Sequence, residues 1–84
     1  MNGPFTVKGY VVEPAVIDAV EAELKRFGKF SLANARNSLI KLGVPHDDGA
    51  ADRAADKIVQ ALKREGKVEF LGRKSVIPWK WIAS

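Results

Sequence analysis

Three segments of the chain carry hydrophobic residues at the spacing of an amphipathic helix. In the first, residues 14–28, the apolar positions recur every three or four residues, at Ile17, Val20, Leu24 and Phe27. Such spacing puts them on one face of a helix. Pro14 suits the first helical position and Gly28 suits the stop. The pattern predicts a helix from about Ala15 to Phe27.

The second and third segments have the same period and recognisable ends. In the second, Ser31 is a favoured N-cap type, Gly43 a stop, and the apolar positions are Leu32, Ala35, Leu39 and Leu42. In the third, we expect Asp47 or Asp48 to cap the helix and Gly66 to end it, with an apolar stripe at Ala51, Ala55, Ile58 and Leu62. The third helix is expected to be the longest.

After Gly66 the apolar period changes to two, as in β-strands. The alternating positions are Val68, Phe70, Ile77, Trp79 and Trp81. We expect a hairpin whose turn is Leu71–Lys74, with Arg73 and Lys74 at its tip. Pro78 cannot donate a ladder hydrogen bond, so it should lie at an edge or a bulge.

Residues 1–13 precede the first helix and are harder to assign. Their apolar stretch FTVKGYVV fits a short strand, an arm along the domain or a frayed tail. The expected organisation is therefore an N-terminal arm or short strand, residues 1–13, followed by one domain, residues 14–84.

The order helix, short gap, helix, turn, helix, hairpin resembles the winged helix-turn-helix superfamily over residues 14–82. The resemblance rests on element order and spacing. It implies an α+β fold in which a small three-helix core carries a C-terminal β-hairpin wing. It also implies that Phe30 lies in a short strand paired with the hairpin, that the third helix is the recognition helix, and that Leu71–Lys74 is the wing. Domains of this kind also serve as protein-protein modules, so function depends on the exposed faces.

The charge of the chain is concentrated in its C-terminal part. The formal net charge is +4, but residues 1–52 hold six Lys/Arg against seven Asp/Glu, giving −1, whereas residues 53–84 hold eight against three, giving +5. Such asymmetry points to a polyanionic partner, of which nucleic acid is the usual one. Double-stranded DNA is the partner that the resemblance and the charge both favour.

The third helix offers a candidate reading surface opposite its apolar stripe. At about 100° per residue, its candidate residues fall within about 60° of one another; they are Arg53, Lys57, Gln60 and Arg64. Arg can bond guanine and Gln adenine in the major groove. The alternative is a solvated polar face, since Asp52 and Asp56 lie beside it and repel phosphate. Asp52 suits the first turn, where it complements the helix dipole.

Two further pairs of cations are candidate backbone contacts. On the second helix, the resemblance to winged helices implies that Arg36 and Lys41 would contact phosphates. In the turn, Arg73 and Lys74 would reach a flanking phosphate or the adjacent minor groove. Here too a solvated turn without a partner is the alternative.

The aromatic residues support a second hypothesis. Trp79 and Trp81 share one face of the predicted strand. Three roles fit this position: packing in the core, stacking on single-stranded RNA or DNA, and forming a protein interface. In the interface version this strand and the N-terminal segment join a homodimer or another protein. A protein-protein interaction module is therefore the main alternative to a small DNA-binding transcriptional regulator.

Catalysis, cofactor binding and membrane insertion are not indicated. The chain has no cysteine, a single histidine, His46, and no Gly-rich phosphate-binding motif. No window approaches the apolar length of a membrane span. We expect a cytoplasmic protein that is not an enzyme and has no metal or cofactor.

Overall fold

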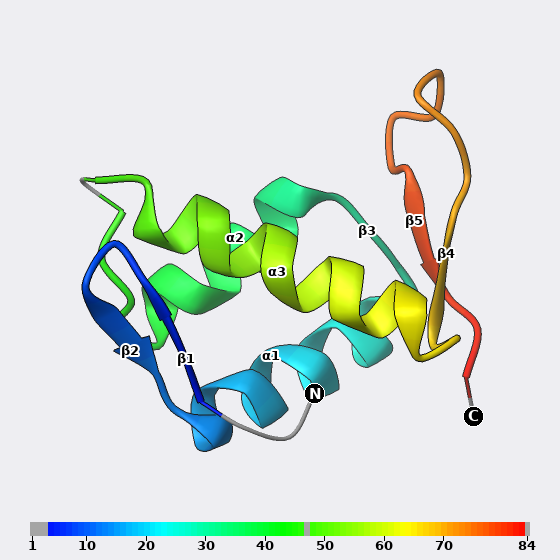
Figure 1. The fold of residues 1–84 in the computed structure, drawn as a ribbon. Helices are drawn as coiled ribbons and strands as arrows, with labels where there is room; N and C mark the ends of the chain where they lie inside the picture. Colours follow the sequence, from blue (N-terminus) through cyan, green and yellow to red (C-terminus); the bar gives the residue numbers. More distant parts are fainter. Residues whose placement is uncertain (1–3, 47, 84) are drawn as a thin grey trace.

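The computed structural model describes residues 4–46 and 48–83, and in that part of the chain three helices and five short strands are found (Figure 1). The helices are α1 (Pro14–Phe27), α2 (Leu32–Lys41) and α3 (Ala50–Arg64). The strands are β1 (Phe5–Val7), β2 (Tyr10–Val12), β3 (Lys29–Phe30), β4 (Val68–Phe70) and β5 (Trp79–Trp81). They form two antiparallel sheets, β1-β2 and β3-β5-β4. The predicted α+β class with three helices is confirmed.

The first two helices begin and end close to their predicted positions. α1 starts at Pro14, one residue before the predicted Ala15, and the Gly28 N–H closes it by donating to the Leu24 carbonyl at 3.1 Å. Ser31 is the N-cap of α2, as predicted. Its Oγ accepts from the Asn34 N–H, and the Asn34 side chain accepts from the Ser31 N–H at 2.8 Å. This reciprocal pair satisfies two of the donors that a helix start leaves free.

The predicted cap of α3 is wrong at Asp48, and Asp47 lies outside the described residues. The N-cap is Gly49, and no side chain caps the helix. Gly49 has φ 78°, a left-handed conformation that an aspartate adopts only at a cost. Asp48 therefore precedes the helix and is exposed, whereas Asp52 lies in the first turn, where its charge complements the helix dipole.

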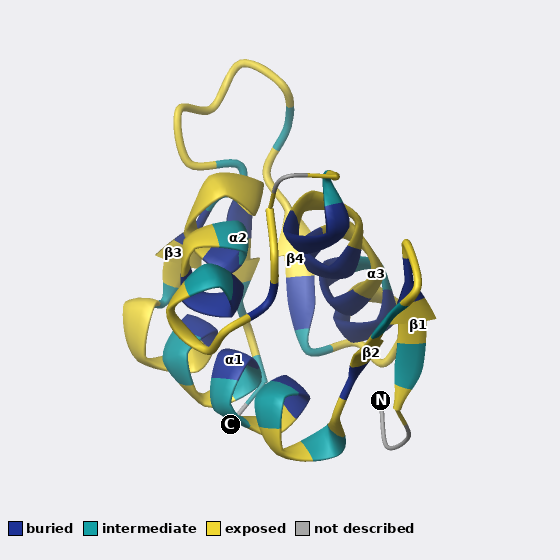
Figure 2. Ribbon diagram, turned by 90° about the vertical axis from the view of Figure 1, so that its left-hand side faces the viewer, coloured by how far each residue is buried: buried dark blue, intermediate teal, exposed yellow. Residues whose placement is uncertain are grey.

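The hydrophobic core lies where the three helices face one another, and Figure 2 shows their buried sides turned inward. The predicted stripe of α3 is buried throughout, at Ala51, Ala55, Ile58 and Leu62. Further alanines, at Ala50, Ala54 and Ala61, widen the stripe. The apolar face of α1 is buried at Ile17, Val20 and Leu24, but Phe27 is 43% exposed.

Ser38 is a polar residue of α2 whose side chain is buried in the core. It is 2% exposed, and its Oγ has no hydrogen-bond partner among the described residues. An unsatisfied buried hydroxyl is destabilising.

Ser38→Ala is therefore expected to raise the free energy of unfolding by about 1 kcal/mol in a urea titration. Ser31→Ala, which removes the α2 cap, should lower it by about 1 kcal/mol. Equal signs for the two variants would contradict these roles.

The C-terminal sheet places β5 between β3 and β4. Phe30 and Phe70 both lie opposite Trp79, and the Phe70 and Trp79 ring centroids are 5.0 Å apart. The hairpin loop is longer than predicted, spanning residues 71–78 rather than 71–74, so Ile77 lies outside the strand. The reason is Pro78, which cannot extend the ladder through its nitrogen. Instead the Leu71 N–H donates to the Pro78 carbonyl and closes the loop.

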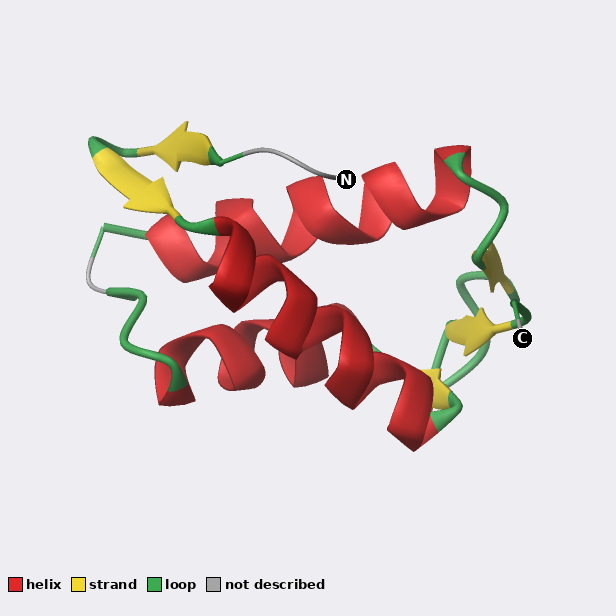
Figure 3. Cartoon of the chain, turned by 90° about the horizontal axis from the view of Figure 1, so that it is seen from below, coloured by secondary structure: helices red, strands yellow, loops and turns green. Residues whose placement is uncertain are grey.

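Residues 5–12 form a β-hairpin, more structure than the arm or short strand predicted for residues 1–13. Its turn, Lys8-Gly9, has φ values of 50° and 78°, as in the two-residue turns that suit twisted hairpins. Val7 and Val12 are buried, and β1 packs against α3. Figure 3 shows this N-terminal hairpin and the C-terminal sheet at opposite ends of the helices.

Candidate nucleic-acid interface

The outer side of α3 carries the cations expected there. Arg53, Lys57 and Arg64 are exposed, whereas Gln60 is partly buried. The helix lies between the two hairpins, with β1-β2 near its N-terminal end and the β4–β5 hairpin rising next to its C-terminal end (Figure 1). The exposed side of α3 is therefore flanked by a second element at each end.

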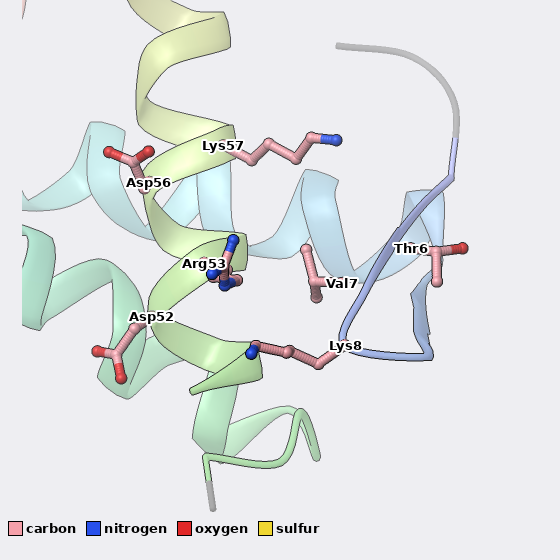
Figure 4. Close-up of a pocket in the computed structure, with 7 residues that line it drawn as sticks. All are labelled: Thr6, Val7, Lys8, Asp52, Arg53, Asp56 and Lys57. Atoms are coloured by element: carbon pink, nitrogen blue, oxygen red, sulfur yellow. The ribbon is translucent and has the colours of Figure 1, made fainter. Parts of the chain in front are cut away.

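An open groove separates the first half of α3 from the N-terminal hairpin. Its volume is about 740 Å³, and its lining residues are Thr6, Val7, Lys8, Asp52, Arg53, Asp56 and Lys57 (Figure 4). Lys8 extends from the hairpin toward α3, on the side of the helix where Arg53 lies. Lys8 was not among the binding residues predicted from the sequence, because residues 1–13 were not assigned to a hairpin.

Lys57 is engaged by the N-terminal hairpin. Its Nζ lies 5.3 Å from the centroid of the Phe5 ring, within the range of a cation–π contact. In Figure 4 its side chain extends to the hairpin side of α3, away from Asp56. Because such contacts at exposed sites are worth only about 0.5–1 kcal/mol, Lys57 can exchange Phe5 for a phosphate at small cost.

The two carboxylates of α3 lie on the other flank of the helix. Figure 4 shows Asp52 and Asp56 directed away from the hairpin. Arg36 Nη1, on α2, lies 3.5 Å from Asp52 Oδ1. Asp52 thus has a cationic neighbour, whereas no described cation lies within ion-pair distance of Asp56. The face of α3 is divided into a cationic flank at the hairpin and an acidic flank toward α2.

The candidate cations of α2 both have carboxylate neighbours. Besides the Arg36–Asp52 pair, Lys41 Nζ lies 3.5 Å from Glu23 Oε1 of α1. Pairs this exposed contribute about 0–1 kcal/mol, so they do not fix the side chains. The two carboxylates nevertheless reduce the positive potential that α2 presents at its surface.

The β4–β5 loop carries the remaining predicted cations. Arg73 and Lys74 are exposed and lie within residues 71–78, a segment without Asp or Glu. The same loop exposes apolar side chains, most of all Val76, which is 94% exposed. The sequence identified the two cations but placed them in a shorter turn.

The tryptophan pair is mostly inside the protein. Trp79 is 5% exposed and belongs to the core. Trp81 is partly buried, and its Nε1–H donates to the Ala83 carbonyl at 2.7 Å. Because β5 is the central strand, its backbone is paired on both sides at residues 79 and 80.

Lys67 forms ion pairs with two glutamates, Glu21 of α1 and Glu65 at the end of α3. Its Nζ lies 3.7 Å from Glu21 Oε2 and 3.3 Å from Glu65 Oε1. The negative charge of Glu21, together with a hydrogen bond to Glu65, raises the pKa of Lys67 above its usual value. Because the pKa of Lys67 is higher in the folded than in the unfolded state, its ion pairs add to the free energy of unfolding at any pH below the unfolded pKa. This contribution is lost as the pH rises through the folded pKa, so it changes only in alkaline solution.

Residues 4–46 and 48–83 contain no group of three or more His, Cys, Asp or Glu placed to hold a metal ion. Within the same part of the chain, each helix is too short or too polar to cross a bilayer. Comparison of the sequence with protein-family models and curated proteins, and of the fold with solved structures, found no significant match.

Proposed function

We propose that this chain is a winged helix-turn-helix domain that binds double-stranded DNA. The observation that carries the proposal is the position of the β4–β5 loop. The hairpin rises next to the C-terminal end of α3, its loop projects away from the helices and exposes Arg73 and Lys74, and α3 exposes Arg53 and Arg64. Strand β3, which contains Phe30 and lies between α1 and α2, pairs with β5 of the hairpin, as the resemblance to winged helices implies. In this arrangement the β4–β5 loop is the wing.

In the proposed complex, α3 lies in the major groove, which is wide enough to admit a helix. Arg53 and Arg64 are then the candidates for bidentate contacts to guanine, and Gln60 for a contact to adenine. Lys57 and the groove's Lys8 are placed to meet backbone phosphates, which position a protein without reading sequence. Arg73 and Lys74 would contact the backbone or minor groove next to the α3 site.

The acidic flank of α3 limits this surface. Arg36 offsets Asp52, but Asp56 repels any phosphate that approaches from the α2 side. The duplex is therefore expected to contact the hairpin flank more closely than the α2 flank. Arg36 and Lys41 would contribute less than Arg53 because each has a carboxylate neighbour.

A protein-protein module remains the alternative function, but its predicted surface is less favourable. Burial of Trp79 and the pairing of β5 on both sides remove most of the aromatic strand from contact with a partner. Exposed apolar groups lie instead on the β4–β5 loop, beside the cations.

The experiment is an amide chemical-shift titration of the labelled protein with a mixed-sequence duplex at about 50 mM and 200 mM salt. Four phosphate contacts predict an affinity loss of about 100-fold across that range, because log K falls by about 0.9 per contact per decade of salt. Shifts should concentrate on residues 52–64 and 71–78. Amides on the outer side of α1, such as those of Asp18 and Ala22, are the internal control. An absence of shifts at low salt would overturn the proposal.

A further inference from the structure

Apolar and cationic side chains share the β4–β5 loop. Val76 is 94% exposed, Ile77 43% and Leu71 40%. Single exposed apolar residues are common, but a group of them on one projecting loop marks a contact surface. Here each of the three apolar residues lies within three positions of Arg73 or Lys74 in the sequence. A partner of this loop must therefore accept apolar groups and positive charge together.

Backbone hydrogen bonds give the loop a defined shape. The Leu71 N–H donates to the Pro78 carbonyl and joins the two arms at the base. Nearer the tip, the Ser75 N–H donates to the Gly72 carbonyl at 3.2 Å. Val76 therefore projects from an ordered turn, and less conformational entropy is lost when it is inserted into a partner.

We propose that this loop enters the DNA minor groove and that Val76, supported by Ile77, wedges between adjacent base pairs and bends the duplex. The inference rests on the proposed function and adds a mode of contact to it. Apolar wedges flanked by cations are a recurring means of opening a base step from the minor groove, with kinks of about 20–90°. Arg73 and Lys74 would meet the phosphates that border the groove.

The charge of the loop favours DNA over an apolar protein partner. Its two cations are not balanced by any acidic residue between 71 and 78. Burying them against an apolar protein surface would leave charges without partners, which is costly. The minor groove offers phosphates at its edges and base edges between them, so both parts of the loop are satisfied in one site.

A wedge also predicts a sequence preference without hydrogen bonds to bases. Pyrimidine–purine steps such as TA and CA unstack most easily. The bound site is therefore expected to favour such a step on the side where the β4–β5 loop lies, next to the segment contacted by α3.

The test measures bending and unstacking separately from binding. A duplex of about 30 base pairs carries a fluorophore pair at its ends for energy transfer, and a second duplex carries 2-aminopurine at a central TA step. We compare the wild type with Val76→Ser and with Val76→Leu, which restores an apolar side chain. Val11→Ser is the matched control, since Val11 is 48% exposed on the N-terminal hairpin. Because these positions are exposed, the fold should be retained, which amide spectra verify.

The wild type, Val76→Leu and Val11→Ser are expected to bend the duplex by about 20–90° and to raise 2-aminopurine fluorescence. Val76→Ser should bind within about threefold, because its cations remain, but lose at least half of the bend and of the fluorescence gain. Salt-sensitive binding without a bend, or an equal bend with Val76→Ser, overturns the wedge and leaves the proposed function standing. Absence of DNA binding by the wild type overturns both.

Discussion

Replacing Val12 with aspartate is expected to destabilise the domain by about 3–5 kcal/mol, because it puts an unpaired carboxylate into the core. Val12 is fully buried, at 0% exposure, on β2. An 84-residue domain has roughly 4–13 kcal/mol of stability in total, so this variant should be largely unfolded or melt far below the wild type. Thermal and urea unfolding followed by circular dichroism measure the change.

Val11→Asp is the matched control for this prediction. It introduces the same carboxylate one residue earlier, where the side chain is 48% exposed and points to the other face of the strand. Its effect should stay within about 0.5 kcal/mol. Equal losses from the two variants would show that residues 5–12 do not pack on α3 as a hairpin, and the groove beside Lys8 would then not exist.

The helices were predictable because the helical spacing of their apolar residues repeats over enough residues to distinguish them from strands. Helices of ten to fifteen residues make several turns, and the boundary residues Pro14, Ser31 and Gly66 placed their ends to within about two residues. The start of α3 was misplaced because capping by an aspartate side chain and capping by a left-handed glycine compete. The local sequence Asp47-Asp48-Gly49 contains both signals.

The N-terminal hairpin was not predicted because its strands are three residues long, too short for a period of two to be evident. Whether it packs on the domain depends on tertiary contacts that local pattern does not encode. A usable signal was nevertheless present in α3. Ala50 and Ala54 lie beside the predicted stripe and are buried, so the apolar face of α3 is wider than the stripe predicted from the sequence.

The candidate site was predictable only where it depends on the geometry of a single helix. Helical geometry places Arg53 and Arg64 on one side of α3 without any knowledge of the fold. Contacts between elements, such as Arg36 with Asp52 or Lys57 with Phe5, depend on how helices and hairpins pack. These contacts change which cations can reach a ligand, so the candidate residues could be predicted from the sequence but their availability could not.

The double variant Arg53→Glu/Arg64→Glu is expected to weaken nonspecific duplex binding by about 100-fold or more at low salt. Two phosphate or base contacts are lost and two repulsive carboxylates are added to the surface proposed to face DNA. The slope of log K against log salt should become shallower by about one for each of the two arginines that contacts a phosphate in the nonspecific complex. Fluorescence anisotropy of a labelled duplex, measured over a series of salt concentrations, gives both quantities.

Lys25→Glu/Arg26→Glu separates location from net charge. Both positions are exposed in the last turn of α1, and either double variant changes the formal charge by −4, from +4 to 0. Lys25 and Arg26 both complement the C-terminus of α1, and Arg64 complements that of α3, so circular dichroism must first verify that each double variant is folded. If binding depends on the α3 face, the α1 variant should lose less than about tenfold, through the long-range field alone. Equal losses of affinity in the two double variants would mean that binding depends on net charge alone, which would contradict the proposal that α3 lies in the major groove.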